Sequence, residues 1–404
     1  MTTSTTLPLG WRATTLSEVV DFKSGGTPAK NDDRFWGGAI PWVSAKDLKS
    51  LRISDSADHL TVEGATRSRC VEAGTVLLLV RGMALHKDVP MGVATRSVSF
   101  NQDVKGLVPR GEVYPDFILN LLLARKEDLL KNVESAGHGT GKLNTDFLQS
   151  LPILIPPLAE QKRITEVLST WDDSLMCLAR QIARKHEATS YLREALVRGA
   201  LRMKRRFKPW PVVSLGDVTE NLSARNSGRF DRNSVMGVTK ADGLVPMKEH
   251  VIADDIGRYL ILPPGGFAYN PMRINIGSIT MSEFEEDVIV SPDYVVFACD
   301  ASRLLPRFLN HVRRTKAWSD FMTIAGNGSV RVRIYYASLA DFEFHLPPLD
   351  EQRAIVEVLD DAEREILSLM AEQAALEKQR DALATELLTG RLRVRGAAKA
   401  AFAR

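Results

Sequence analysis

The chain contains one 13-residue pattern twice, and this duplication limits the folds that it can adopt. Residues 156–168 read PPLAEQKRITEVL and residues 347–359 read PPLDEQRAIVEVL, with nine identical positions at an offset of 191. Chance similarity between two amphipathic helices would not reproduce both the Pro-Pro-Leu entry and the Glu-Gln pair. We therefore interpret the chain as two copies of one structural unit.

The offset of 191 extends well beyond the motif. It relates Pro115 to Pro306, Phe117 to Phe308, Leu192 to Leu383, Leu196 to Leu387, Gly199 to Gly390 and Leu201 to Leu392. The two copies also open alike, since Trp11 and Leu16 resemble Trp210 and Leu215, but there the offset is 199. The front of the second copy is therefore eight residues shorter, whereas the motif and the segment after it keep strict register.

The front portion of each copy has the pattern of a globular domain. Val76–Val80 and Val288–Val290 are typical of strands, and glycine, proline, asparagine and aspartate mark frequent turns. A helix is expected near Asp116–Glu134, with a counterpart near Arg303–Ile324. The globular portions are therefore predicted to be α+β.

Each motif is expected to open a long helix, because tandem prolines are tolerated just before a helix but not inside it. Apolar residues then alternate at spacings of four and three, which is the seam of a coiled coil. In the first copy the seam is Ile164, Leu168, Trp171, Leu175, Leu178 and Ile182, and in the second it is Ile355, Leu359, Ala362, Ile366 and Leu369, continuing through Leu376, Leu383 and Leu387. Each helix is expected to run for about 45 residues, or roughly 70 Å.

The charges of the two helices indicate that they pair with each other. Residues 180–208 contain ten Lys or Arg and two acidic residues, whereas residues 350–381 contain ten acidic and four basic ones. The first helix ends where the second domain begins, and the second helix begins where that domain ends, so the pair should be antiparallel. The alternative is that the basic run is only a solvated face.

These observations predict two globular α/β domains that alternate with two helices, paired as an antiparallel coiled coil with pseudo-twofold symmetry. The expected boundaries are a first domain at 1–157, a helix at 158–208, a second domain at 209–348, a helix at 349–395 and a flexible tail at 396–404.

Composition limits the class of protein. Hydrophobic residues make up 44% and charged residues 25% of the 404 residues, which is a globular composition, and no run of 18 apolar residues would span a membrane. The start of the chain has no secretion signal, and the three cysteines form neither a disulfide framework nor a metal spacing, so a reducing cytoplasm is expected. The net charge of +3 does not by itself indicate nucleic acid.

The chain resembles the specificity subunit of type I restriction-modification enzymes, over essentially its whole length. The resemblance rests on two variable domains alternating with two helices that open with Pro-Pro-Leu-x-Glu-Gln. The stretches Gly25–Pro28 and Phe35–Trp42 are also similar to domain openings of that family. The second domain lacks this opening, but its segments Tyr269–Met272 and Val290–Tyr294 recur in other members.

The resemblance implies a DNA-recognition subunit without catalysis of its own, in which each globular domain reads one half of a bipartite, asymmetric double-stranded DNA target. The helices would set the gap between the half-sites and dock two methyltransferase subunits, and restriction subunits would join them. S-adenosylmethionine would belong to the methyltransferase subunits, and neither a cofactor nor a metal is expected in this chain.

Basic and amide side chains in turn-rich stretches are the candidate DNA contacts, because Arg and Lys bind phosphates and guanine, and Asn binds adenine. They are Arg81, His86, Lys87, Arg96, Asn101 and Lys142 in the first domain, and Arg225, Arg229, Lys240, Arg273, Asn275, Arg331 and Arg333 in the second. For each residue alone, a solvated surface role is an equal alternative. The glycine-containing segments 137–142 and 326–333 correspond across the repeat and would let the backbone approach DNA.

Two other classes of function stay open at this point. One is a coiled-coil scaffold that joins proteins without touching DNA, and the other is an enzyme such as a methyltransferase or nuclease. The chain has no phosphate-binding Gly-x4-Gly-Lys-Ser/Thr loop, and its seven histidines show no metal spacing. Tyr269–Met272 is similar to the Asn-Pro-Pro-aromatic motif of amino-methyltransferases, but it lacks the second proline and the aromatic residue. A core or DNA-facing strand is the expected role of that segment.

Overall fold

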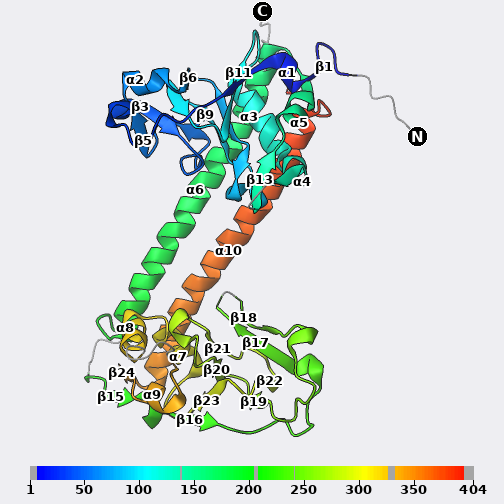
Figure 1. The fold of residues 1–404 in the computed structure, drawn as a ribbon. Helices are drawn as coiled ribbons and strands as arrows, with labels where there is room; N and C mark the ends of the chain where they lie inside the picture. The colour runs from blue at the N-terminus through cyan, green and yellow to red at the C-terminus, as the bar shows by residue number, and fades with distance from the viewer. Residues whose placement is uncertain (1–6, 137–138, 204–207, 241, 326–332, 395–404) are drawn as a thin grey trace, which may run out of the picture. The chain divides into compact units, whose positions relative to one another are not determined.

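The computed structural model describes residues 7–136, 139–203, 208–240, 242–325 and 333–394 (Figure 1). They form two compact units, unit 1 from Met1–Leu178 with Glu372–Arg404 and unit 2 from Ala179–Ala371. Each unit contains one of the expected domains together with a part of each long helix. Among the described residues, no helix has the length and apolarity needed to cross a membrane.

Two mixed sheets form the centre of the globular part of unit 1, in the spatial orders β5-β3-β10-β6 and β2-β11-β7-β9-β4. The pair β1-β14 and the small sheet β12-β13-β8 complete it. The strands are β1 (Arg12–Thr15), β2 (Val20–Ser24), β3 (Trp36–Val43), β4 (Arg52–Ile53), β5 (Asp58–Leu60), β6 (Arg69–Val71), β7 (Val76–Leu79), β8 (Arg81–Gly82), β9 (Met91–Ala94), β10 (Val98–Phe100), β11 (Val104–Pro109), β12 (Val133–Ala136), β13 (Thr140–Leu143) and β14 (Pro152–Ile155). The helices are α1 (Leu16–Val19), α2 (Val62–Thr66), α3 (Pro115–Ala124), α4 (Lys126–Lys131) and α5 (Thr145–Ser150).

Unit 2 repeats this plan with two four-stranded sheets, β16-β23-β20-β21 and β18-β17-β22-β19, and the pair β15-β24. The strands are β15 (Val212–Ser214), β16 (Thr219–Leu222), β17 (Val235–Thr239), β18 (Gly243–Pro246), β19 (Leu260–Leu262), β20 (Phe267–Tyr269), β21 (Ile279–Met281), β22 (Val288–Val290), β23 (Val295–Cys299) and β24 (Glu343–His345). The helices are α7 (Pro306–Val312), α8 (Lys316–Ala325) and α9 (Tyr336–Ala340). The α+β prediction is confirmed, and β7 and β22 coincide with the two strands expected from sequence.

Each predicted helix of the globular portions is two helices. The stretch expected as one helix near Asp116–Glu134 is divided into α3 and α4, and its counterpart is divided into α7 and α8. The break follows from local geometry, since Arg125 has φ −105° and ψ 14°, outside the helical region. The division occurs in both copies, so the repeat extends to this detail.

The long helices are α6 (Leu158–Val197) and α10 (Leu349–Leu388), of 40 residues each. They begin directly after the tandem prolines, as expected, but the length of about 45 residues and the ends at 208 and 395 were wrong. Gly199 and Gly390 follow the last helical turns with φ +73° in both, a left-handed conformation that glycine adopts without strain and that ends the helix.

Both units contain antiparallel contacts between α6 and α10. In unit 1 the Arg380 guanidinium binds the Asp172 carboxylate at 2.9 Å. In unit 2 the Lys185 ammonium lies 2.6 Å from Glu365, and Arg193 lies 2.7 Å from Glu363. The later residue of α6 meets the earlier residue of α10, so the antiparallel pairing and the complementary charge predicted from sequence are confirmed.

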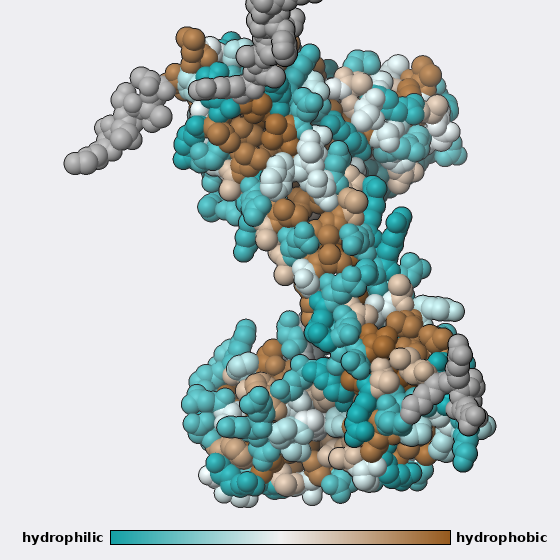
Figure 2. All heavy atoms as spheres, turned by 180° about the vertical axis from the view of Figure 1, so that it is seen from behind, coloured by the Kyte–Doolittle hydropathy of each residue, from teal (hydrophilic) through white to brown (hydrophobic). Residues whose placement is uncertain are grey.

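The helix ends belong to the domain cores. Ile164, Leu168 and Leu387 are buried in the main hydrophobic cluster of unit 1, and their repeat partners Ile355, Leu359 and Leu196 are buried in the main cluster of unit 2. Farther along α6, Trp171, Leu175 and Leu178 are only half-buried. Figure 2 shows hydrophobic side chains reaching the surface over the helical part of the chain, among hydrophilic ones. The two helices alone therefore bury Ile182 and Ile366 but leave other positions of the seam partly exposed.

Candidate functional site

The small sheet of unit 1 brings cationic side chains together. Strand β13 pairs with β12 on one side and with β8 on the other, so that Lys142 lies opposite Glu134 and opposite Arg81. The 3₁₀ turn η2 (Met83–His86) follows β8, and its His86 Nε2 lies 2.7 Å from the Gly139 carbonyl oxygen. Lys87 is exposed at the end of this turn. The structure thus gathers four of the six candidates of the first domain.

Glycine allows this close packing. A Cβ on Gly141 would lie 2.9 Å from the Leu85 Cβ and 3.1 Å from the Gly82 carbonyl oxygen. Any side chain at 141 would therefore push β13 away from η2. We name this arrangement of β8, η2 and β13 the first-domain frame.

Unit 2 repeats part of this frame at the repeat offset, namely one hydrogen bond and the 3₁₀ turn. The Leu143 amide donates to the Val80 carbonyl at 2.9 Å in unit 1, and the Ile334 amide donates to the Pro271 carbonyl at 3.0 Å in unit 2. The 3₁₀ turn η7 (Ile274–Ile276) then occupies the place of η2. We name residues 271–277 with Arg333 and Ile334 the second-domain frame.

The second-domain frame carries exposed candidates of its own. Arg273, Asn275 and Arg333 are all exposed. Lys240 joins them, because its side chain lies 3.5 Å from the place of a Cβ on Gly277. Arg331 lies outside the described residues, as do 326–332 as a whole and 137–138 in the first glycine segment.

The electrostatics of the first-domain frame favour an anionic ligand. Lys142 and Arg81 are direct neighbours on adjacent strands, and like charges in that position repel each other. The negative charge of Glu134, which lies opposite Lys142, offsets the charge of Lys142. Among the described residues, however, no ion pair within 4.0 Å involves Arg81, Lys87 or Lys142. Exposed guanidinium, ammonium and amide groups of this kind can bind phosphates and base edges.

Other candidates lie apart from the frames. Arg96 is exposed in the turn between β9 and β10. Arg225 donates to the Arg258 carbonyl at 3.2 Å, and the Arg229 guanidinium lies 5.6 Å from the centre of the Phe230 ring. Within the described part of the chain, no contact joins these three residues to a frame.

Asn101 requires a correction. Its side-chain oxygen accepts a hydrogen bond from the Asp103 amide at 3.1 Å, and its side-chain nitrogen donates to the Asp103 carboxylate at 3.2 Å. The residue is also buried. Because both ends of the amide are engaged in a local turn, we remove Asn101 from the candidate DNA contacts.

The glutamates of the repeated motif perform a role that sequence reasoning missed. Glu351 is buried and accepts from the Trp210 indole at 3.0 Å and from the Arg202 guanidinium at 2.9 Å and 3.1 Å. Glu160 in unit 1 makes the same contacts with Trp11 at 3.1 Å and with Arg393. Each motif therefore fastens the first residues of one helix to the segment after the other helix and to the opening of a domain. We call these clusters the Trp-Glu-Arg clamps.

The glutamines of the motif complete the attachment. Gln161 accepts from the Tyr114 amide and donates to the Glu112 and Pro156 carbonyls at 3.0 Å and 2.9 Å. Gln352 accepts from the Leu305 amide and donates to the Arg303 and Pro347 carbonyls, both at 2.8 Å. The signal for the clamps was present in the sequence, since Arg202 and Arg393 are separated by the repeat offset of 191.

The contacts of the clamp in unit 2 lower the pKa of Glu351. Burial raises the pKa of Glu351, but hydrogen bonds from Arg202 and Trp210 outweigh it and hold the pKa below its ordinary value. The carboxylate thus stays ionised at neutral pH. It pairs with a guanidinium that also stacks on the ring of Trp210, 4.2 Å from its centre.

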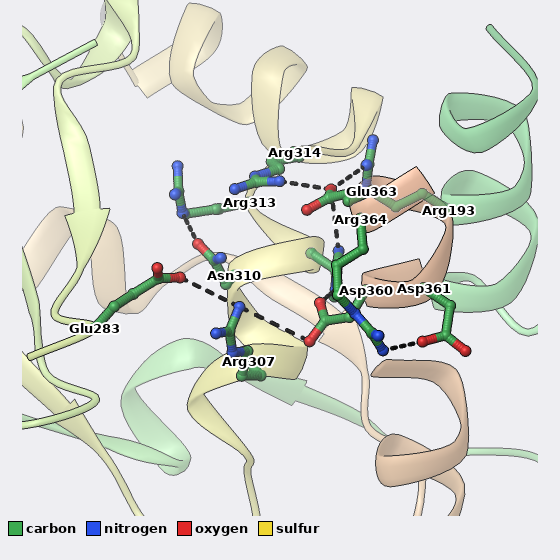
Figure 3. A network of polar contacts seen from close by, with 11 residues as sticks. Arg193, Glu283, Arg307, Asn310, Arg313, Arg314, Asp360, Asp361, Glu363 and Arg364 are labelled. Carbon is green, nitrogen blue, oxygen red and sulfur yellow. Dashed lines mark hydrogen bonds and ion pairs between the residues drawn. The ribbon is translucent and has the colours of Figure 1, made fainter. Parts of the chain in front are cut away.

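A polar network in unit 2 joins Asp360 and Glu363 of α10 to several arginines (Figure 3). Ligand atoms of His311, Asp360 and Glu363 lie within 4.8 Å of one another, a grouping that histidine spacing did not predict. Glu363 is however paired with Arg193 at 2.7 Å and Arg314 at 2.6 Å, and Arg307 lies 3.8 Å from Asp360. These cations neutralise the carboxylates, so the cluster is an ion-pair network and does not suit a divalent cation.

The segment Tyr269–Met272 is the end of a core strand followed by a turn. Tyr269 is fully buried, and the Asn270 side-chain oxygen accepts from the Met272 amide at 2.9 Å. The turn leads directly into η7 of the second-domain frame. Tyr269 therefore has the core-strand role expected of the segment, whereas Asn270 to Met272 form a turn and not a strand.

Comparison with known proteins identifies relatives. The family model described as "Type I restriction modification DNA specificity domain" matches residues 8–184 and 257–378. The EcoR124I/EcoR124II specificity subunit of Escherichia coli is 30% identical over 189 residues, which is 45% of this chain and 47% of that one, so the match spans about half of that relative. The MjaVIII specificity subunit of Methanocaldococcus jannaschii is 22% identical over 96% of this chain and 94% of its own.

Solved structures share the fold over nearly the whole chain. One chain, from a study of complex assembly and conformational transition of the type I R-M system, has a TM-score of 0.59 and 17% identity, covering 96% of this chain and all of that one. The S subunit of M. genitalium has a TM-score of 0.54 and 13% identity, covering 96% and 98% of the two chains.

Proposed function

Because the chain belongs to the family of type I restriction-modification DNA specificity proteins, we propose that it is the DNA-recognition subunit of such a system and that each domain reads one half of a bipartite, asymmetric target. The family role is recognition of a DNA target. Under this proposal the first-domain frame reads one half-site and the second-domain frame reads the other.

One observation carries the proposal, namely that a hydrogen bond and a 3₁₀ turn of the frame recur at the repeat offset with different exposed side chains. At the repeat offset, Arg81 corresponds to Met272 and Ala84 to Asn275, whereas Lys142 corresponds to Arg333. A partly shared frame with different donors suits two half-sites of different sequence. Phosphate contacts would position each domain, and Arg and Asn side chains would read base edges.

The partners follow from the long helices. Half-buried Trp171, Leu175 and Leu178, together with the exposed Leu367 and Met370, leave apolar surface along α6 and α10. We propose that these helices set the gap between the half-sites and dock two methyltransferase subunits, with restriction subunits added to that assembly. Methyl transfer and S-adenosylmethionine binding would then reside in the methyltransferase subunits, and this chain would contribute recognition.

A scaffold that joins proteins without touching DNA is the competing function, and salt-dependent DNA binding separates the two. We expect the full chain to bind duplex DNA with an affinity that falls steeply as salt rises, because several Lys and Arg side chains would release counterions from phosphates. Fluorescence anisotropy of labelled duplexes from about 50 to 200 mM salt measures the slope. Binding that is absent, or insensitive to salt, favours the scaffold.

A further inference from the structure

A pocket of about 580 Å³ lies in unit 2 beside the second-domain frame. Its lining includes Lys240 and Asp242, which lie between β17 and β18, together with residues of β21 and of the end of α7. Strand β18 approaches β21 closely, since a Cβ on Gly243, which has φ +68°, would lie 3.0 Å from the Thr280 hydroxyl oxygen. Lys240 both lines the pocket and packs over Gly277 of the frame.

The charged groups that line the pocket do not neutralise one another. They are Lys240, Asp242, Glu283, Arg313 and Arg314. Glu283 pairs with Arg307, which lies outside the pocket lining, at 3.2 Å, and Arg314 pairs with Glu363 at 2.6 Å. Lys240 and Arg313 form no ion pair within 4.0 Å among the described residues, although the Glu283 and Glu363 carboxylates are near enough to oppose the lowering of the pKa of Arg313.

Arg313 is held in place by a neutral group. Its Nε donates to the Asn310 side-chain oxygen at 2.7 Å, and Asn310 is itself buried. In Figure 3 the Arg313 guanidinium extends to the side away from Glu363, toward which Arg314 turns. Its two terminal nitrogens thus stay available in a fixed orientation, which suits bidentate binding of a planar or tetrahedral oxyanion.

The surroundings of Arg313 disfavour an isolated cation. Burial and the neighbouring Arg314 lower the pKa of Arg313 to about 10. A guanidinium with this pKa is still protonated at neutral pH. An anion in the pocket would relieve the repulsion between the two arginines and restore the solvation that burial removes.

We propose that this pocket binds one phosphate group of the DNA backbone, with Arg313 as the oriented donor and Lys240 as the second cation. The inference rests on the proposed function. DNA is favoured over a free anion because Lys240 contacts the frame that carries Arg273 and Asn275. A strand held by the frame would therefore bring a backbone phosphate to the neighbouring pocket.

The test compares two arginines of unit 2. In Arg313→Gln we expect the slope of log affinity against log salt to fall by about one, because one phosphate contact is lost, and binding to weaken by roughly fivefold at physiological salt. Lys240→Gln should change binding in the same direction. Arg364→Gln removes the same charge from α10 in unit 2, but Arg364 is exposed, lies outside the pocket lining and is already paired with Asp361, so its slope should equal that of the unaltered chain.

The outcomes separate this inference from the proposed function. If the unaltered chain binds DNA but Arg313→Gln and Lys240→Gln behave like Arg364→Gln, the phosphate site is overturned and the function stands. If the unaltered chain binds no DNA, both fail. A titration with inorganic phosphate distinguishes the source, since protection by free phosphate with an unchanged DNA slope also overturns the inference. Lys240 is exposed, so Lys240→Gln decides the matter even if Arg313→Gln does not fold.

Discussion

Glu351→Ala is expected to lower the free energy of unfolding of unit 2 by about 3–5 kcal/mol, because removing one partner of a buried ion pair leaves the other uncompensated. Glu351 and Arg202 are 5% and 14% exposed, and the same carboxylate also accepts from the Trp210 indole. The substitution therefore leaves the Arg202 guanidinium and the Trp210 indole without their hydrogen-bond acceptor. Both lie where the end of α6 and the opening of the second domain meet the start of α10. Urea denaturation of the full chain measures the loss.

Glu357→Ala is the matched control for this prediction. Glu357 lies on the same helix and is exposed, so its replacement should change stability by no more than about 0.5 kcal/mol. Equal stability of the two variants would show that the clamp does not hold the domain to the helices.

Acid should weaken the same interaction. Because the folded pKa of Glu351 lies below its ordinary value, the contribution of this carboxylate is complete above the unfolded pKa of about 4.3 and is lost as pH falls through the folded value. The stability difference between the unaltered chain and Glu351→Gln should accordingly shrink below about pH 4.

The double replacement Arg81→Gln with Lys142→Gln is expected to weaken DNA binding by on the order of tenfold or more at physiological salt, and to lower the salt slope by about two. Both side chains are exposed, lie on adjacent strands of the first-domain frame, and have no ionic partner among the described residues. Their mutual repulsion without DNA implies that folding should not suffer. Anisotropy titrations at several salt concentrations measure both quantities.

The control removes two cations from the same domain that already have partners. Arg34 pairs with Asp32 at 2.7 Å and Lys46 with Asp58 at 2.8 Å. Arg34→Gln with Lys46→Gln changes the net charge equally but should leave the slope near that of the unaltered chain. If both double variants weaken binding alike, general charge rather than the frame attracts DNA.

Much of the architecture could be predicted because both copies of the repeat show the same sequence patterns. Proline pairs define where α6 and α10 begin, and the spacing of apolar residues together with opposite charge runs defines their pairing. The helix ends were misplaced because helical periodicity continues past Gly199 and Gly390, whereas the left-handed conformation at each glycine ends the helix.

The frames and the clamps depend on long-range contacts that composition does not reveal. Lys142 meets Arg81 only through strand pairing, and Glu351 meets Arg202 across 149 positions of sequence. Asn101 has the residue type of an adenine reader, but its turn with Asp103 uses up both ends of its amide. Arg313 was overlooked because only the structure distinguishes it from Arg307 and Arg314, which are neutralised.

The central claim is that two domains of one chain read the two halves of a single DNA target. Sequencing of modified bases in the host genome, with and without this gene, tests it most directly. We predict the loss of methylation at one bipartite motif, whose two different half-sites are separated by a fixed gap. An unchanged pattern of methylation, or the loss of a single contiguous motif, would contradict the account.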